Sequence, residues 1–215
     1  MQENNSTVIK RKTIVYVDGF NLYFGLKTKK WKNYYWLNIY KLAENIIKSD
    51  QELITVKYFT SRIASPPDKA KRQGTFIEAL ETLENFKIYY GNYQANSRAC
   101  RKCGNIEIVS NEKMTDVNIA VEMLADAFQN LFDNAVLISG DSDLTAPIIK
   151  IKKLFSNKKI SLCFPPERFS YSLSQIAAGF FMIGRRTLAK SVFPDEVIKK
   201  DGFVLKRPDR WKNNE

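Results

Sequence analysis

The sequence contains no histidine among its 215 residues. This absence excludes a Ser-His-Asp triad, acid–base catalysis by imidazole, and any zinc site that requires an imidazole ligand. Any catalysis would therefore rest on carboxylates, Lys, Tyr, Ser or a bound metal.

Cysteine and long apolar runs are also scarce. The three cysteines, Cys100, Cys103 and Cys163, are too few for a disulfide framework. The N-terminal segment lacks the apolar stretch of a secretory signal, and no apolar run approaches the roughly 20 residues that span a bilayer. We therefore expect a cytoplasmic protein that has no membrane partner.

Positive charge, in contrast, is in excess. The 34 Lys and Arg residues outnumber the 23 Asp and Glu residues, which gives a net charge of +11. Such a balance is typical of proteins that bind nucleic acids, although a solubility role or a membrane-surface patch would produce the same composition. With 44% hydrophobic residues, the chain can also build a sizeable core.

Apolar segments rich in β-branched residues alternate with segments of helical periodicity. This order predicts an α/β fold with a central, mostly parallel sheet of about five to six strands. The strands are expected near residues 13–18, 53–63, 86–94, 135–139, 158–164 and 180–184, and the helices near residues 39–47, 67–83, 115–131, 144–155 and 171–178.

The chain divides into one domain with extensions. Residues 1–12 are expected to be flexible, residues 13–189 to form the domain, and residues 190–215 to form a basic C-terminal extension that wraps the domain or contacts a partner. A hairpin insertion is expected near residues 95–111. In the predicted helix 115–131, the core stripe is expected to comprise Val117, Ala120, Val121, Leu124 and Phe128, with Asp126 solvated or supporting a site.

Three separated segments bring acidic residues to the end of a predicted strand or the start of a predicted helix. The first strand, in IVYVDGFN, runs into Asp18 and Asn21, and the fourth, in VLISGDSDL, runs into Asp141 and Asp143. Asp116 opens a helix in EKMTDVNIA. Because ligands of parallel sheets bind at the carboxyl ends of the strands, we expect these side chains to converge there.

Each segment alone has an ordinary structural explanation. Asp-Gly is a common turn pair, and Asp116 could cap its helix. In SGDSD, however, one acid can cap the next helix, which leaves the second carboxylate without a structural role. Neighbouring like charges raise each other's pKa unless a cation is present, and oxygen-only ligands suit Mg²⁺ or Mn²⁺. Together the segments predict a divalent metal site that acts on a polyanion.

The ordered set VYVDGFNLY, EKMTDVNIAVEMLADAF and AVLISGDSDLTAPI resembles the NYN domain family, in the LabA-like branch of the PIN-like nucleases. The resemblance covers roughly residues 10–186. It implies a Rossmann-like, three-layer fold with a compact acidic pocket, and a metal-dependent ribonuclease that acts on single-stranded RNA. The pocket would be formed by the five matching residues, namely Asp18, Asn21, Asp116, Asp141 and Asp143.

Roles for these residues follow from phosphodiester chemistry. Asp18, Asp116 and Asp141 are expected to hold Mg²⁺ or Mn²⁺, Asp143 to be a further ligand or to hold the attacking water, and Asn21 to orient phosphate or water. Contacts to nucleic acid are expected from Lys113, Arg62, Arg72, Arg168 and Ser139.

Aromatic residues could stack bases of a bound strand. Tyr23 and Phe24 are candidates. Trp31 and Trp36 are candidates too, but a position in the core or at an interface is favoured for both.

Cys100 and Cys103 form half of a zinc-ribbon pattern. The other half is missing, so a four-ligand Zn²⁺ site within one chain is not expected, unless two chains share a metal or carboxylates complete it. A redox-active pair or the remnant of a lost site are the other interpretations.

Two other functions remain open at this stage. A haloacid-dehalogenase-like phosphatase would need a second acid where Phe20 stands, which disfavours that class. A non-catalytic nucleic-acid-binding or regulatory adaptor with the same fold is compatible with charge and pattern alike. A homodimer is a further expectation, from the aromatic segments.

Overall fold

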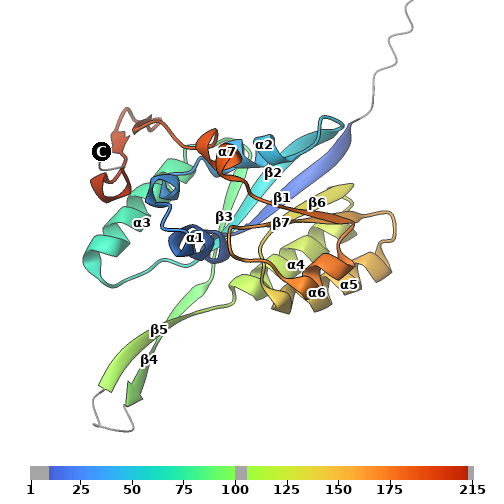
Figure 1. The fold of residues 1–215 in the computed structure, drawn as a ribbon, viewed down its shortest axis with the longest axis horizontal. Coiled ribbons are helices and arrows are strands. Elements are labelled where there is room, and N and C mark those ends of the chain that lie inside the picture. The colour runs from blue at the N-terminus through green and yellow to red at the C-terminus, as the bar shows by residue number, and fades with distance from the viewer. Residues whose placement is uncertain (1–9, 100–105, 213–215) are drawn as a thin grey trace, which may run out of the picture.

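A six-stranded sheet in the order β3-β2-β1-β6-β7-β8 forms the middle layer of the protein (Figure 1). The computed structural model describes residues 10–99 and 106–212. Every neighbouring pair of strands in this sheet is parallel, which confirms the predicted α/β architecture. The strands are β1 (Arg11–Asp18), β2 (Gln51–Thr60), β3 (Phe86–Tyr90), β6 (Asn134–Ile138), β7 (Lys159–Phe164) and β8 (Gly179–Met182).

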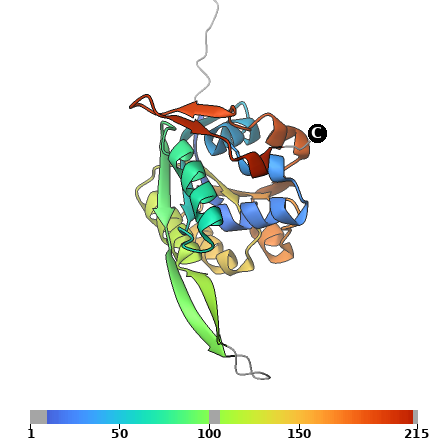
Figure 2. The same ribbon diagram turned by 90° about the vertical axis from the view of Figure 1, so that its left-hand side faces the viewer.

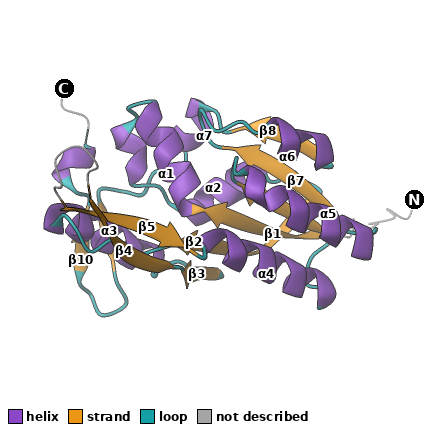
Figure 3. Ribbon diagram, turned by 90° about the horizontal axis from the view of Figure 1, so that it is seen from below, coloured by secondary structure: helices purple, strands orange, loops and turns teal. Residues whose placement is uncertain are grey.

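Helices cover both faces of this sheet (Figures 1 and 3). Because side chains alternate along a strand, Val15 and Val17 of β1 enter one core cluster, whereas Ile14 and Tyr16 enter the other. None of the described helices could cross a membrane. One layer contains α1 (Gly19–Thr28), α2 (Ile39–Ile46), α3 (Pro67–Leu80) and α7 (Arg185–Ala189), and the other contains α4 (Thr115–Phe128), α5 (Thr145–Leu154) and α6 (Tyr171–Ile176).

The order of strands reverses direction between β1 and β6. The chain moves outward from β1 through β2 to β3, and later from β6 through β7 to β8 on the other side. The carboxyl ends of β1 and β6 therefore lie next to each other with connections that lead away in opposite directions. Open α/β sheets bind their ligands at such a point.

A two-stranded arm, formed by β4 (Asn92–Ala99) and β5 (Ile106–Lys113), projects from the body of the molecule (Figures 1 and 2). The strands pair antiparallel, so the predicted hairpin is present. The single strand predicted over residues 86–94 breaks at Gly91, where the chain leaves the central sheet and enters the arm. Cys100 and Cys103 lie outside the described residues.

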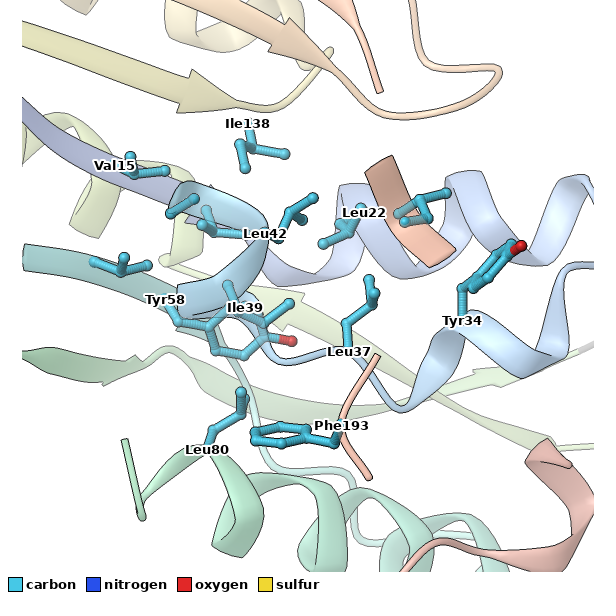
Figure 4. Close-up of a cluster of buried hydrophobic side chains, with 14 of the residues drawn as sticks. Val15, Leu22, Tyr34, Leu37, Ile39, Leu42, Tyr58, Leu80, Ile138 and Phe193 are labelled. Carbon is cyan, nitrogen blue, oxygen red and sulfur yellow. The ribbon is translucent and has the colours of Figure 1, made fainter. Parts of the chain in front are cut away.

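The C-terminal extension folds back onto the layer that contains α3 (Figure 2). Phe193 joins the same core cluster as Leu80, and the two side chains lie close together in Figure 4. The indole nitrogen of the buried Trp36 donates a hydrogen bond to the Pro194 carbonyl at 2.8 Å. The extension, with β9 (Glu196–Ile198), β10 (Val204–Lys206) and η3 (Asp209–Trp211), is thus an integral part of the domain.

The apolar stripe predicted for the core side of α4 instead faces solvent. Val117, Val121 and Phe128 are 56%, 57% and 78% exposed, whereas Ile119 and Met123 are buried. The prediction was wrong because the buried face of the helix also carries polar residues, which concealed its period. The exposed stripe is an uncharged, apolar surface on this layer of the protein.

Asp126 lies on the buried face of α4 and does not support a site at the sheet edge. The Nζ atom of Lys57 on β2 lies 2.8 Å from Asp126 Oδ1 and 2.7 Å from Glu122 Oε2. The Tyr16 hydroxyl donates to Asp126 Oδ2 at 2.5 Å. Since Lys57 and Asp126 are both buried, this network fixes α4 to the sheet, and each charge depends on its partner.

Replacing Lys57 with Met should therefore destabilise the fold strongly. Asp126 would stay buried without its cation, and we expect the free energy of unfolding in urea to fall by about 3–5 kcal/mol. Lys41→Met is the matched control, since Lys41 pairs with Glu44 on the surface and should cost less than about 1 kcal/mol. Equal losses in the two variants would contradict this role of the network.

Candidate active site

Asp18 is the last residue of β1 and lines the candidate site. Its Oδ1 atom accepts a hydrogen bond from the backbone N–H of Asn21 at 2.9 Å, so the carboxylate also caps α1. Gly19 is required next to it, because a Cβ there would lie 2.5 Å from the Tyr58 hydroxyl oxygen and 2.8 Å from the Phe59 carbonyl oxygen. Close packing of α1 on β2 thus directs Asp18 to the carboxyl edge of the sheet.

Hydrogen bonds connect this carboxylate to the loop after β6. Ser139 is fully buried, donates to Asp18 Oδ2 at 2.9 Å and accepts from the backbone N–H of Asp141 at 3.0 Å. The side-chain oxygen of Asn21 accepts from the backbone N–H of Gly140 at 3.0 Å. Ser139 was predicted to contact nucleic acid; in the fold it holds Asp18 and the Asp141 loop together.

Asp141 and Asp143 begin the turn that follows β6. The Asp143 backbone N–H donates to Asp141 Oδ1 at 3.0 Å, so Asp141 caps η2 (Ser142–Leu144). Asp141 is half-buried and lines the same pocket as Asp18, whereas Asp143 is exposed beside it. The sequence pattern SGDSD thus provides one capping acid and one acid that no helix cap requires.

Asp116 reaches the pocket from α4. Met114 precedes this helix in the left-handed region, with a φ of 77°, and Thr115 and Asp116 occupy its first turn. Neither of them is the N-cap residue, although Asp116 was a candidate cap. Asp116 is half-buried and lines the pocket together with Asp18 and Asp141.

The crowding of these acids changes their proton affinity. Burial raises the pKa of Asp18 to about 6, and the Asp116 and Asp141 carboxylates add to this effect, while hydrogen bonds from Asn21 and Ser139 oppose it. Burial, Asp141 and Asp143 also raise the pKa of Asp116. Like charges therefore meet in a partly desolvated cavity of about 300 Å³.

The donors suit a hard divalent cation. All are carboxylate or amide oxygens, which Mg²⁺ and Mn²⁺ prefer, and bound positive charge would offset the burial and the neighbouring negative charge that raise the pKa of Asp18. Among the described residues, no three acidic side chains stand close enough to hold one ion as they are placed. Asp18, Asp116 and Asp141, which line the same pocket, are the residues that would hold such an ion.

Arg168 provides a positive charge at the rim of this pocket. The loop that carries Arg168 packs tightly against the segment after β6 and against α1. A Cβ on Gly140 would lie 1.8 Å from the Arg168 carbonyl oxygen, and a Cβ on Gly25 would lie 2.5 Å from the Pro166 carbonyl oxygen. The guanidinium lies over the Phe24 ring, 5.9 Å from its centroid. Its buried Nε has no hydrogen-bond partner among the described residues.

The other residues predicted to contact nucleic acid are dispersed. Arg62 is held by Tyr90, to whose hydroxyl it donates at 3.1 Å, and by Glu81. Arg72 lines a second, larger cavity beside the acids. Lys113 is the last residue of β5, and its contact with phosphate stays a prediction.

Phe20, which was not predicted as a site residue, and Phe24, which was a candidate for base stacking, line both the acidic pocket and the larger cavity. The available signal was the sequence DGFNLYF, in which they follow Asp18 at helical spacing. Trp36, for which a position in the core or at an interface was favoured over base stacking, is fully buried in the core, as predicted.

Comparison with known proteins gives three results. The family model of the NYN domain matches residues 12–184. A curated relative, the 6-hydroxy-3-succinoylpyridine 3-monooxygenase HspA of Pseudomonas putida, is 27% identical over 188 residues, which cover 72% of this chain and only 59% of that protein. A solved structure, of a Vibrio parahaemolyticus protein of unknown function, shares the fold with a TM-score of 0.55 at 19% identity, covering 90% of this chain and 100% of the other.

The raised pKa of Asp18 predicts a pH-dependent effect of Asp18→Asn in the absence of metal. A folded-state value of about 6 against an ordinary 3.8 means that the folded protein binds this proton more tightly, so Asp18 removes stability as the pH rises through this range. The Asp18→Asn variant does not lose this stability, because asparagine does not ionise. Its Tm relative to wild type, measured in EDTA, should rise by a few degrees between about pH 4 and pH 7. A difference that does not change with pH would contradict the raised pKa of Asp18.

Proposed function

The chain belongs to the NYN domain family, and on this premise we propose that it is a Mg²⁺- or Mn²⁺-dependent nuclease that hydrolyses phosphodiester bonds of single-stranded RNA. The observation that carries the proposal is the convergence of Asp18, Asp116 and Asp141 on one pocket at the switch point of the sheet. In a chain of net charge +11, an acidic pocket is suited to act on a polyanion that the rest of the surface attracts.

The chemistry assigns separate tasks to the pocket residues. A bound divalent ion would neutralise phosphate charge and ease the loss of a proton from water. Asp18, Asp116 and Asp141 would hold that ion, with Asp18 kept in place by Ser139. Asp143, at the exposed side, is suited to orient the attacking water and to accept its proton.

Two further side chains would hold the phosphate. The Arg168 guanidinium at the pocket rim can donate to non-bridging phosphate oxygens. Asn21 accepts from Gly140 with its oxygen, so its amide nitrogen is the group that can donate to phosphate or water. Attack by water oxygen on phosphorus would expel a ribose oxygen. The preference for RNA over DNA rests on the family.

Two other functions can be distinguished from this one by experiment. An adaptor that binds RNA without cleaving it would have the same charge and fold. The Pseudomonas putida relative is named as a monooxygenase of a hydroxypyridine, and the larger, tyrosine-lined cavity beside the acids could accept a flat anionic ring. Oxygen uptake that depends on such a pyridine would favour that activity.

The test is cleavage of a labelled single-stranded RNA, with a DNA of the same sequence, in Mg²⁺, Mn²⁺ or EDTA. We expect metal-dependent cleavage of RNA, and a loss of at least about 100-fold in Asp141→Asn, since one ligand of the site is weakened.

Asp133→Asn is the matched control for this assay. Asp133 precedes the same strand at its opposite end, where it accepts a hydrogen bond from the Lys12 backbone that asparagine can preserve. Cleavage should persist in this variant. Metal-dependent cleavage that survives in Asp141→Asn would overturn the assignment, and binding without cleavage by wild type would favour the adaptor.

A further inference from the structure

A cavity of about 980 Å³ adjoins the acidic pocket and shares Phe20 and Phe24 with it as a common wall. It is bounded by α1, by η1 (Lys32–Tyr35), by α3 and by the segment Arg210–Lys212 at the end of the described chain. This segment lies beyond residues 12–184, which the family model matches. We call this cavity, with its walls, the aromatic groove.

The charge of the aromatic groove is opposite to that of its neighbour. Among the described residues that line it, seven are Lys or Arg and none is Asp or Glu. Arg72 and Arg210 form no ion pair within the described residues, whereas Lys212 pairs with Asp209 at 2.8 Å. An anion would thus find uncompensated positive charge beside a pocket of carboxylates.

Aromatic rings form much of its lining. Tyr23 and Tyr35 lie with ring centroids 5.1 Å apart, and Trp211 contacts Tyr35 edge-on at 5.9 Å. Burial raises the pKa of Tyr35 to about 12 and that of Tyr23 above its ordinary value despite Arg72. Both phenols are therefore neutral near pH 7, and they leave the positive charge of the groove undiminished.

The C-terminal wall of the groove is firmly held. Arg207 donates from Nη2 to the Asn33 carbonyl and to the Trp211 carbonyl, at 2.7 Å in each case. Trp211 also contacts Phe76 and Trp36, with centroid distances of 6.2 and 6.4 Å. The wall is thus formed before any ligand arrives, which lowers the entropic cost of binding.

We propose that the aromatic groove binds the nucleotides next to the scissile phosphate, and that the C-terminal segment, through Trp211 and Arg210, is the element with which this chain selects its RNA. Bases would stack on the partly exposed rings of Trp211, Tyr23 and Tyr35, while Arg72 and Arg210 contact phosphates. The strand would pass Phe20 and Phe24 into the acidic pocket. The identity of the polymer rests on the proposed function.

Binding is measured in EDTA, so that it does not depend on cleavage. The probe is a fluorescein-labelled single-stranded RNA octamer, titrated at several salt concentrations, beside the same RNA as a duplex. Arg72→Gln/Arg210→Gln should weaken binding and reduce the slope of log K against log salt by about 0.7 for each phosphate that the protein no longer neutralises.

Lys150→Gln/Lys153→Gln is the matched control, because it removes the same charge from exposed positions on α5, in the opposite layer. It should leave the salt slope close to that of wild type. An equal fall in slope for the two double variants would contradict binding in the aromatic groove. It would indicate that RNA is held by diffuse electrostatic attraction instead. A duplex that binds as tightly as the single strand would also overturn it, because paired bases cannot stack on the groove.

The aromatic contact is tested separately. Trp211→Ala should weaken octamer binding about 5- to 100-fold, and Trp211→Phe, which retains a ring, should recover most of this affinity. Thermal melting of both variants identifies any loss of folding. Wild-type affinity in a folded Trp211→Ala protein would overturn the role of the C-terminal segment. If binding follows these expectations but the protein cleaves the RNA with neither Mg²⁺ nor Mn²⁺, the role of the aromatic groove in binding is supported and the proposed nuclease activity is contradicted.

Discussion

The burial of neighbouring carboxylates at the carboxyl ends of β1 and β6 is the constraint around which the site is organised. Parallel pairing of these two strands brings Asp18 beside the loop that carries Asp141, and α4 adds Asp116 from the other layer. Burial and neighbouring charge raise the pKa of Asp18 to about 6. A fold retains such a cost where positive charge arrives from a ligand, and a divalent cation would bring that charge.

The core clusters and the buried ion pair stabilise the fold against the cost of burying the acids. Two core clusters pack against opposite faces of the sheet, and the buried Lys57–Asp126 pair fixes α4, the helix that delivers Asp116. The C-terminal extension completes one cluster through Phe193 (Figure 4). The acids thus stand on rigid elements, with an acidic pocket and a basic, aromatic groove side by side at one edge of the sheet.

The local sequence pattern was sufficient to predict much of the fold and the position of two of the acids. Strands that are buried on both faces read as continuous apolar runs, and acids that directly follow such runs must meet at one edge, so Asp18 and Asp141 could be placed together. The inward face of α4 could not be predicted, because Asp126 is buried only by virtue of Lys57, a residue distant in the sequence. Arg168 was predicted to contact nucleic acid together with Arg62, Arg72 and Lys113, and only the packing of its loop on Gly140 distinguishes it from them as the one at the acidic pocket.

The most direct test of the metal site is binding of Mn²⁺ to the metal-free protein, measured by electron paramagnetic resonance. The wild-type protein should bind Mn²⁺ at the acidic pocket, with competition by Mg²⁺, and the binding should be abolished in an Asp18→Asn/Asp116→Asn variant that remains folded. Mn²⁺ binding of equal strength and stoichiometry in that variant would contradict the claim that the crowded carboxylates form a metal site.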